Sequence, residues 1–212
     1  QQLLEYAAVG NYEAGVFEEL TGEFHDNFDP IIIFKAFEAS RLDHVSFLLE
    51  LPRAERFVNI RDSQTTSRRA LHYAAFFGDL RLIERLSELG AKPEKTDSKN
   101  ERPIHKAAAK GHLDAVCLLY SIYPFINTMS ECKSPIYVAT RNQHIAVVLF
   151  ILYETKFMSY NTSFNAKLLK IAVDHNNEEL VSVLVNSPKL IFSGSDVQKL
   201  IRKCESTTVI NI

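Results

Sequence analysis

Two histidines in near-identical surroundings are the first side chains in this sequence that could do chemistry. His72 lies in the stretch RALHYAAFFGD and His105 in RPIHKAAAKGH, 33 residues further on. Imidazole titrates near neutral pH and therefore suits general base catalysis or metal binding. Neither histidine belongs to an H-E-x-x-H pattern or to another ligand spacing. The sequence also lacks a G-x-S-x-G motif and the glycine motifs that hold phosphates or dinucleotides. We therefore expect no catalytic residues, no metal site and no cofactor.

The cysteines are the other candidates for nucleophilic chemistry or for cross-linking. Cys117, Cys132 and Cys204 are odd in number, widely spaced and free of any C-x-x-C pair, so they predict neither a disulfide framework nor a zinc site. Arg202 and Lys203 would favour the thiolate of Cys204, but no partner base is identified, and we interpret Cys204 as a surface thiol. This cysteine usage favours a reducing compartment such as the cytoplasm.

The composition is typical of a globular protein. Of 212 residues, 46% are hydrophobic and 24% are charged, and the net charge is −2. That charge argues against a protein that coats nucleic acid, which requires an excess of cations. The longest apolar run, residues 145–153, is too short to span a membrane, and we interpret it as a buried helix. Because the chain starts at Gln1 rather than at methionine, we expect a fragment of a larger protein.

The elements that position these residues repeat along the chain. Residues 69–91, 102–124, 134–156 and 168–188 align with one another, and 32–52 is a further copy that precedes a longer connection. Each copy has a first segment with small residues and a second segment with an apolar stripe at helical spacing. The expected stripe residues are Leu82, Ile83 and Leu86, then Ala115, Val116 and Leu119, then Val147, Val148 and Ile151. One helix pair cannot bury both of its faces, whereas stacked pairs can.

This pattern resembles the ankyrin repeat, whose motif starts T-P-L-H-x-A-A-x-x-G-H and continues into a hydrophobic second helix. RALHYAAFFGD, RPIHKAAAKGH and SPIYVATRNQH carry the resemblance. It implies an all-α solenoid of helix-turn-helix units with hairpin-like fingers, in a single domain. The expected repeats are 1–27, 28–61, 62–96, 97–127, 128–160 and 161–192, followed by a C-terminal capping helix over 193–212. The resemblance also implies that His72 and His105 hydrogen-bond backbone groups and so join neighbouring repeats.

The same resemblance implies a non-enzymatic module that binds another protein. In ankyrin repeats, the residue after the histidine and the two residues before the glycine line a concave groove, and the finger loops flank it. The residues expected to contact a partner are Arg68, Tyr73, Phe76, Phe77, Lys99, Lys106, Lys110, Lys133, Arg141 and Asn142. They form an aromatic cluster followed by a basic strip, which predicts a partner segment that is apolar and acidic. We expect a monomer without a membrane span.

Three alternatives remain open at this point. The connection over 53–68 contains the apolar stretch RFVNI and could fold over Phe76 and Phe77 and bury them. The chain could also be the targeting or regulatory part of a larger protein, such as a bacterial effector delivered into the host cytosol, with its catalytic domain elsewhere. Nucleic-acid binding through the basic strip is disfavoured, because Glu101 and Glu131 interrupt the strip.

Overall fold

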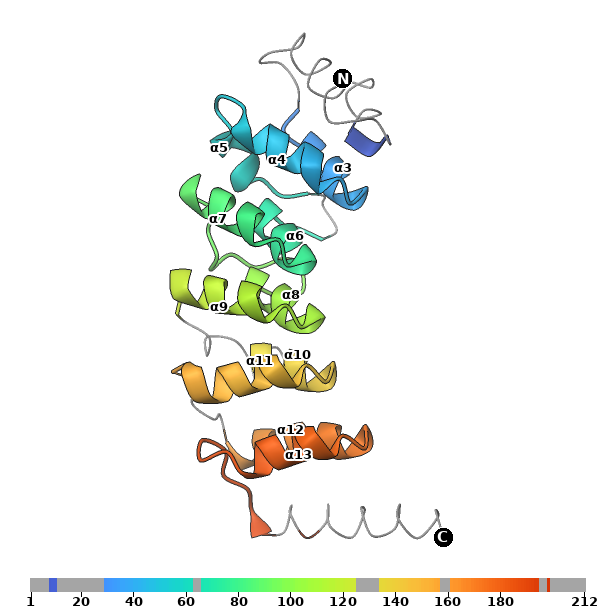
Figure 1. Ribbon diagram of the computed structural model, residues 1–212, viewed down its shortest axis with the longest axis vertical. Coiled ribbons are helices and arrows are strands. Elements are labelled where there is room, and N and C mark those ends of the chain that lie inside the picture. Colours follow the sequence, from blue (N-terminus) through green and yellow to red (C-terminus); the bar gives the residue numbers. More distant parts are fainter. Residues whose placement is uncertain are drawn as a thin grey trace. The chain divides into compact units, whose positions relative to one another are not determined.

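A computed structural model of the chain describes residues 8–10, 29–62, 66–124, 134–156 and 161–194, together with Gln198. Within these ranges, every regular element is a helix (Figure 1). The chain divides into two compact units, residues 1–106 and 107–212. The expected first repeat and the expected capping helix lie almost entirely outside the described residues.

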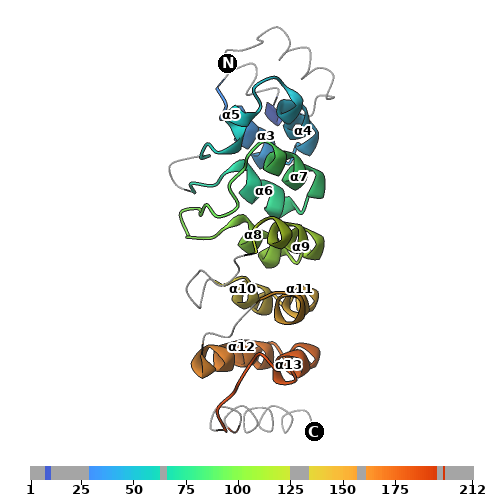
Figure 2. The same cartoon turned by 90° about the vertical axis from the view of Figure 1, so that its left-hand side faces the viewer.

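The first unit contains two stacked helix pairs, in which first helix contacts first helix and second helix contacts second helix. Its elements are α3 (Ile32–Glu38), α4 (Leu42–Glu50), α5 (Glu55–Val58), α6 (Ala70–Phe77) and α7 (Leu80–Glu88). Helix α3 packs on α4 and α6 on α7, while α3 also contacts α6 and α4 contacts α7 (Figure 2). The boundary between the two units falls inside the next helix, α8 (Pro103–Lys110).

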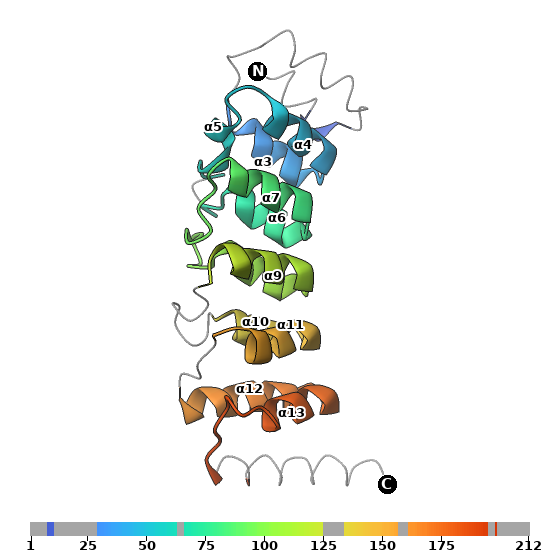
Figure 3. The same ribbon diagram turned by 60° about the vertical axis from the view of Figure 1, so that its left-hand side comes forward.

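The second unit continues the alternation of first and second helices. Its further elements are α9 (Leu113–Ile122), α10 (Pro135–Arg141), α11 (Ile145–Leu149), the π-helix η2 (Phe150–Glu154), α12 (Thr162–Asp174) and α13 (Glu178–Val185). Helix α10 contacts α12, and α11 contacts both α9 and α13. The second helices α9, α11 and α13 therefore follow one another in one row (Figure 3).

The turn between the two helices of a pair has the same left-handed backbone conformation in each of the described repeats. Gly78 and Gly111 adopt left-handed φ angles of 72° and 75°, and Ser40, Gln143 and Asn176 adopt 57°, 62° and 51° at the corresponding positions. Glycine reaches this region without steric cost, which explains its place in the motif, whereas a side chain there costs about 1 kcal/mol or more. The repeat spacing predicted from the sequence is thus visible in the backbone itself.

Within each unit, the core lies between the two helices of a pair and between neighbouring pairs. All nine predicted stripe residues of the second helices are buried, which confirms that part of the sequence analysis. Ala74, Ala75, Ala107 and Ala108 in the first helices are fully buried as well. Their small side chains let the helix backbones approach closely while the packing stays dense.

The apolar run over 145–153 behaves differently from its prediction. It forms α11 and the start of η2, and Val147, Val148 and Ile151 are buried as expected. Leu149 and Tyr153, however, are exposed. The prediction of a buried helix is therefore right for one face and wrong for the other. A second helix of a two-layer repeat has its neighbours on one side, so its opposite side faces outward whatever residues it carries.

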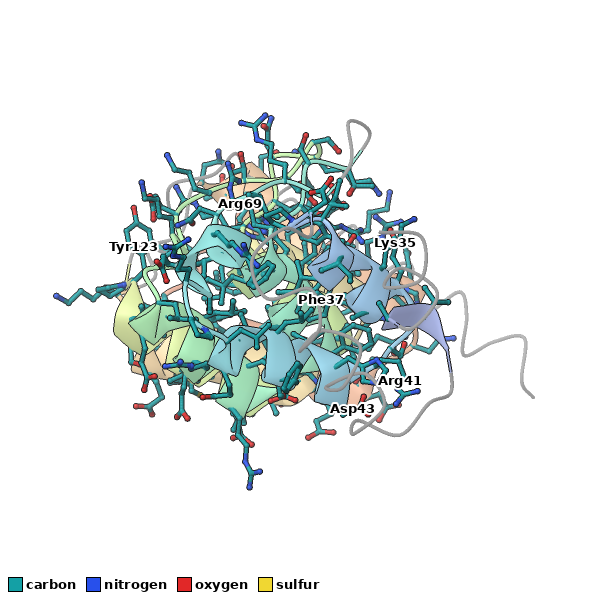
Figure 4. The ribbon with its side chains drawn as sticks, turned by 90° about the horizontal axis from the view of Figure 1, so that it is seen from above. Lys35, Phe37, Arg41, Asp43, Arg69 and Tyr123 are labelled. Atoms are coloured by element: carbon teal, nitrogen blue, oxygen red, sulfur yellow. The ribbon has the colours of Figure 1, made fainter. Side chains whose placement is uncertain are left out.

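The N-terminal end of the described structure is tied down at the start of α4. Arg41 donates hydrogen bonds from Nε and Nη2 to the two carboxylate oxygens of Asp43, over 3.1 and 2.8 Å, and from Nη1 to the carbonyl of Gly10, over 2.6 Å. Figure 4 shows Arg41 and Asp43 together at the periphery, with Phe37 pointing inward among the helices. Phe37 packs against aromatic rings of α6.

Candidate protein-binding site

Five aromatic rings from α3 and α6 form one cluster in the first unit. Phe37 stacks on Tyr73 with ring centroids 5.1 Å apart and on Phe77 at 6.4 Å. Phe34 lies 5.8 Å from Tyr73, and Phe76 meets Phe77 edge to face at 5.4 Å. Aromatic pairs prefer these offset and edge-to-face arrangements, which add stability beyond the burial of area. We call Phe34, Phe37, Tyr73, Phe76 and Phe77 the aromatic cluster.

Burial within the aromatic cluster increases from Phe76 and Phe77 towards α3. Phe34 and Phe37 are buried, whereas Phe76 and Phe77 keep part of their surface exposed. The connection that could have covered them instead forms α5, whose Phe57 and Val58 are themselves buried and which contacts α6. In the described residues, therefore, the connection does not bury Phe76 and Phe77 completely.

Tyr73 was expected to line the groove, but it is only 8% exposed. Its hydroxyl donates a 2.7 Å hydrogen bond to the Asp62 carboxylate. Burial, together with this hydrogen bond, raises the pKa of Tyr73 to about 12. A buried, hydrogen-bonded phenol fixes the loop to the helix, and little of its surface is left for a partner. We therefore remove Tyr73 from the expected contact residues.

Asp62 organises the loop that precedes α6, which we call the first finger (residues 62–68). Its carboxylate accepts hydrogen bonds from the Thr66 hydroxyl and, over 3.0 Å, from the backbone N–H of Arg68. The backbone N–H of Asp62 donates to the Arg68 carbonyl over 2.8 Å. The two ends of the finger are thus held together by one aspartate.

Asp97 does the same for the second finger (residues 97–101), which precedes α8. Its Oδ1 accepts the backbone N–H groups of Lys99 and Glu101, both over 2.9 Å, and its own N–H donates to the Glu101 carbonyl over 2.9 Å. The two fingers are joined directly, because the Ser98 N–H donates to the Thr66 carbonyl over 2.8 Å.

Asp97 also neutralises two members of the expected basic strip. Lys106, only 6% exposed, places its Nζ 2.7 Å from Asp97 Oδ2 and also pairs with Glu101. Arg68 lies 4.0 Å from the same carboxylate, with its guanidinium 5.6 Å above the Tyr73 ring. Burial alone would raise the pKa of Asp97, but the hydrogen bonds from Lys106 and from the Glu101 N–H outweigh it and lower the pKa. Lys106 is therefore a structural residue, and Arg68 offers a partner little net charge.

His72 joins the first helix of its own repeat to the second finger. The N–H of Arg69 donates to His72 Nδ1 over 3.2 Å, so the ring proton resides on Nε2, which donates to the Glu101 carbonyl over 3.0 Å. Burial lowers the pKa of His72 to about 4, so the ring is neutral. His105 repeats the first contact, with the Arg102 N–H 3.1 Å from its Nδ1. These bonds confirm the structural role that the resemblance implies for His72.

The remaining expected contact residues divide between the units. In the first unit, Lys99 is exposed in the second finger. In the second unit, Lys110, Arg141 and Asn142 are exposed, and the Asn142 side-chain amide donates to the Ala109 carbonyl over 2.9 Å. Lys133 lies outside the described residues.

The sequence analysis missed the two aspartates that build the fingers. Both are followed by serine, as Asp62-Ser63 and Asp97-Ser98, and both stand shortly before a repeated histidine. Aspartate is favoured in tight loops because its carboxylate accepts backbone N–H groups a few residues later. The repeated Asp-Ser pair is therefore a signal that could have located the fingers.

Among the described residues, no group of three His, Cys, Asp or Glu side chains could hold a metal ion. In the same residues, no helix has the length and apolar character needed to cross a membrane.

The chain was compared with models of known protein families. A model described as ankyrin repeats (three copies) matches residues 33–130 and, in a second match, residues 71–163. The matched part covers both helix pairs of the first unit and continues through η2 in the second. It also includes the repeated histidines and the fingers. In length, it amounts to more than half of the sequence. The chain belongs to the ankyrin repeat family.

Proposed function

We propose that this chain binds another protein through the exposed edge of the aromatic cluster, with Phe76 and Phe77 as the main contacts. Ankyrin repeats are in general protein-protein interaction modules, and no catalytic activity is expected of them. The finer assignment, to a particular surface and to a partner of particular chemistry, is our proposal.

The observation that carries the proposal is the partial exposure of two phenylalanines on a rigid support. Phe77 stacks on the buried Phe37, and Phe76 meets Phe77 edge to face. The two rings therefore lose little conformational freedom when a partner covers them, and buried aromatic side chains dominate the energetics of protein interfaces. The fingers, fixed by Asp62 and Asp97, belong to the same unit as the two rings.

The partner segment that fits this surface is mainly apolar. Two cations of the expected basic strip in the first unit, Arg68 and Lys106, share the Asp97 carboxylate, so the attraction for an acidic partner is smaller than the sequence predicts. Lys99 remains exposed and could meet one acidic side chain. In the second unit, Lys110, Lys133, Arg141 and Asn142 stay proposed contacts.

Comparative affinity capture tests the proposal. Immobilised wild-type chain, a Phe76→Ala/Phe77→Ala variant and a Leu80→Ala control are each exposed to the same cell extract, and the retained proteins are identified by mass spectrometry. Leu80 is also an exposed apolar residue of the first unit, so the control loses a similar surface elsewhere. We expect the double variant to lose specific proteins that the wild type and the control retain. An unchanged set, with both variants folded by circular dichroism, would rule the proposed surface out.

A further inference from the structure

The row of second helices in the second unit has a face that its own repeats do not cover. Helices α9, α11 with η2, and α13 are neighbours in this row (Figure 3). Each buries one side, through residues such as Leu119, Ile151 and Leu184. The opposite side of the row is what we call the outer face.

The outer face is apolar along α11 and η2. Leu149 in α11 is 36% exposed and Tyr153 in η2 is 47% exposed, and these residues stand four positions apart on one side of a continuous helix. Val185 at the end of α13 is 52% exposed. Ile122 of α9 does not belong to this face, because it stands three residues after the buried Leu119. Apolar side chains are therefore exposed on two neighbouring members of the row, α11 with η2 and α13, and exposed apolar patches mark interaction surfaces.

The fold itself does not require this apolar character. Helix α7 is the second helix of a pair in the first unit, and its exposed residues include Arg81, Glu84 and Glu88. Arg85 of α7 pairs with Glu50 at 3.5 Å and with Glu88 at 3.3 Å. A charged outer side, as in α7, is the ordinary pattern for an amphipathic helix, so the composition of α11 and η2 needs a separate reason.

Within the helices of this row, the charged residues all have one sign. Helices α9, α11, η2 and α13 contain Asp114, Glu154, Glu178 and Glu179, and they contain no lysine or arginine. All four carboxylates are exposed, and none forms an ion pair with another described residue. An apolar face bordered by unpaired carboxylates is complementary to a surface that is apolar and cationic.

We infer that the outer face docks an amphipathic helix of a partner protein, with leucine-like residues on its inner side and lysine or arginine at its edges. A helix of about 18 residues is about 27 Å long, which suffices to cross three helices spaced about 9 Å apart. The same carboxylates repel anionic lipid headgroups and phosphates, which disfavours a membrane surface or a nucleic acid as the occupant. This surface is separate from the aromatic cluster and does not depend on it.

Fluorescence anisotropy with model peptides tests the inference on the full chain. The probe is a fluorescein-labelled peptide of about 18 residues whose leucines fall on one helical face and whose lysines fall on the other. Comparison peptides carry glutamate in place of lysine, or the same leucines and lysines in scrambled order. The chain is tested as the wild type, as Leu149→Ser/Tyr153→Ser, as Glu154→Gln/Glu178→Gln/Glu179→Gln, and as Leu80→Ser, which removes an exposed leucine from α7.

We expect the wild type and Leu80→Ser to bind the leucine-lysine helix equally, and both outer-face variants to bind it at least about tenfold more weakly. Both comparison peptides should also bind at least about tenfold more weakly, and added salt should weaken the leucine-lysine complex. Equal binding of the glutamate peptide, or unchanged binding by either outer-face variant, would overturn the inference. The inference would also be overturned if the wild type formed a dimer that Leu149→Ser/Tyr153→Ser dissociates. Cosedimentation of the wild-type chain with phosphatidylserine vesicles would overturn it as well. Because Phe76 and Phe77 are intact throughout, these outcomes are independent of the proposed function.

Discussion

At the scale of single residues, His72 shows how a group suited to chemistry is used for structure. Its neutral ring connects the Arg69 N–H to the Glu101 carbonyl, and protonation would remove the acceptor at Nδ1. Burial depresses the folded-state pKa to about 4, below the unfolded value of about 6.5, so the unfolded chain binds more protons between these values. Stability contributed by the neutral ring is therefore complete above about pH 6.5 and declines as the pH falls towards 4.

This linkage gives a measurable pH dependence. Between pH 7.5 and pH 4.5, His72 should account for a loss of about 2.5 kcal/mol in the free energy of unfolding. Urea unfolding of the wild type and of His72→Gln at several pH values checks this. The variant should be less stable at pH 7.5 yet show a shallower decline on acidification. Identical slopes for the two proteins would contradict the assignment.

Thr140 is a residue-scale departure from the repeat that should reduce stability. It stands in α10 where the two preceding repeats have Ala75 and Ala108, and it is 0% exposed. Its hydroxyl has no hydrogen-bond partner in the described structure. Because an unsatisfied buried hydroxyl costs about 1 to 3 kcal/mol, Thr140→Val should raise the free energy of unfolding by about 1 kcal/mol. Thr162→Val, at an exposed position in α12, is the control, and an equal effect of both changes would refute the argument.

At the scale of elements, the turn between the paired helices α8 and α9 requires a glycine. Gly111 has a φ of 75°, and a Cβ built there would lie 2.5 Å from Nδ1 of His144. His144 itself places Nε2 3.0 Å from the Ala109 carbonyl, so the ring has little freedom to move aside. The turn of one repeat therefore provides the space for the histidine of the next.

Gly90 supplies a matched control for this contact. It has a φ of 83°, but no atom lies within 4 Å of a built Cβ. Gly90→Ala should therefore cost about 1 to 2 kcal/mol from backbone strain alone, and Gly111→Ala should cost clearly more because the contact adds to the strain. Chemical denaturation of both variants measures the difference. Equal losses would mean that the His144 contact contributes nothing.

The fingers are elements whose shape depends on one buried carboxylate each. Asp97 accepts two backbone N–H groups and pairs with the buried Lys106, so Asp97→Asn leaves a cation under-compensated. We expect a loss of about 2 to 4 kcal/mol, against about zero for Asp114→Asn on the exposed side of α9. Since its folded-state pKa is lowered, the stability that Asp97 provides is present at neutral pH and is lost as the pH falls below its ordinary range. Thermal unfolding at neutral pH measures the loss for both variants. A similar fall in melting temperature for Asp97→Asn and Asp114→Asn would mean that the Asp97 carboxylate is unimportant.

At the scale of the whole molecule, the repeat could be predicted from the sequence because its signals are local and recur. The histidine, the alanines and the apolar stripe each return at a nearly constant spacing, and the structure buries every predicted stripe residue. The expected site was less predictable, because exposure depends on contacts across loops. Tyr73 and Lys106 occupy groove positions of the motif, but Asp62 and Asp97 bind them from the fingers. The exposed side of α11 was missed because hydrophobicity alone does not show which faces have neighbours.

The central claim is that a partner protein covers Phe76 and Phe77. Amide hydrogen exchange of the full chain, measured with and without a purified protein from the capture experiment, tests it most directly. The account predicts slower exchange on binding in residues 73–78 and in the second finger, with little change at the exposed residues of α7. The account would be contradicted if two results came together. Binding would slow exchange elsewhere but not in residues 73–78, and Phe76→Ala/Phe77→Ala would bind the same partner as tightly as the wild type.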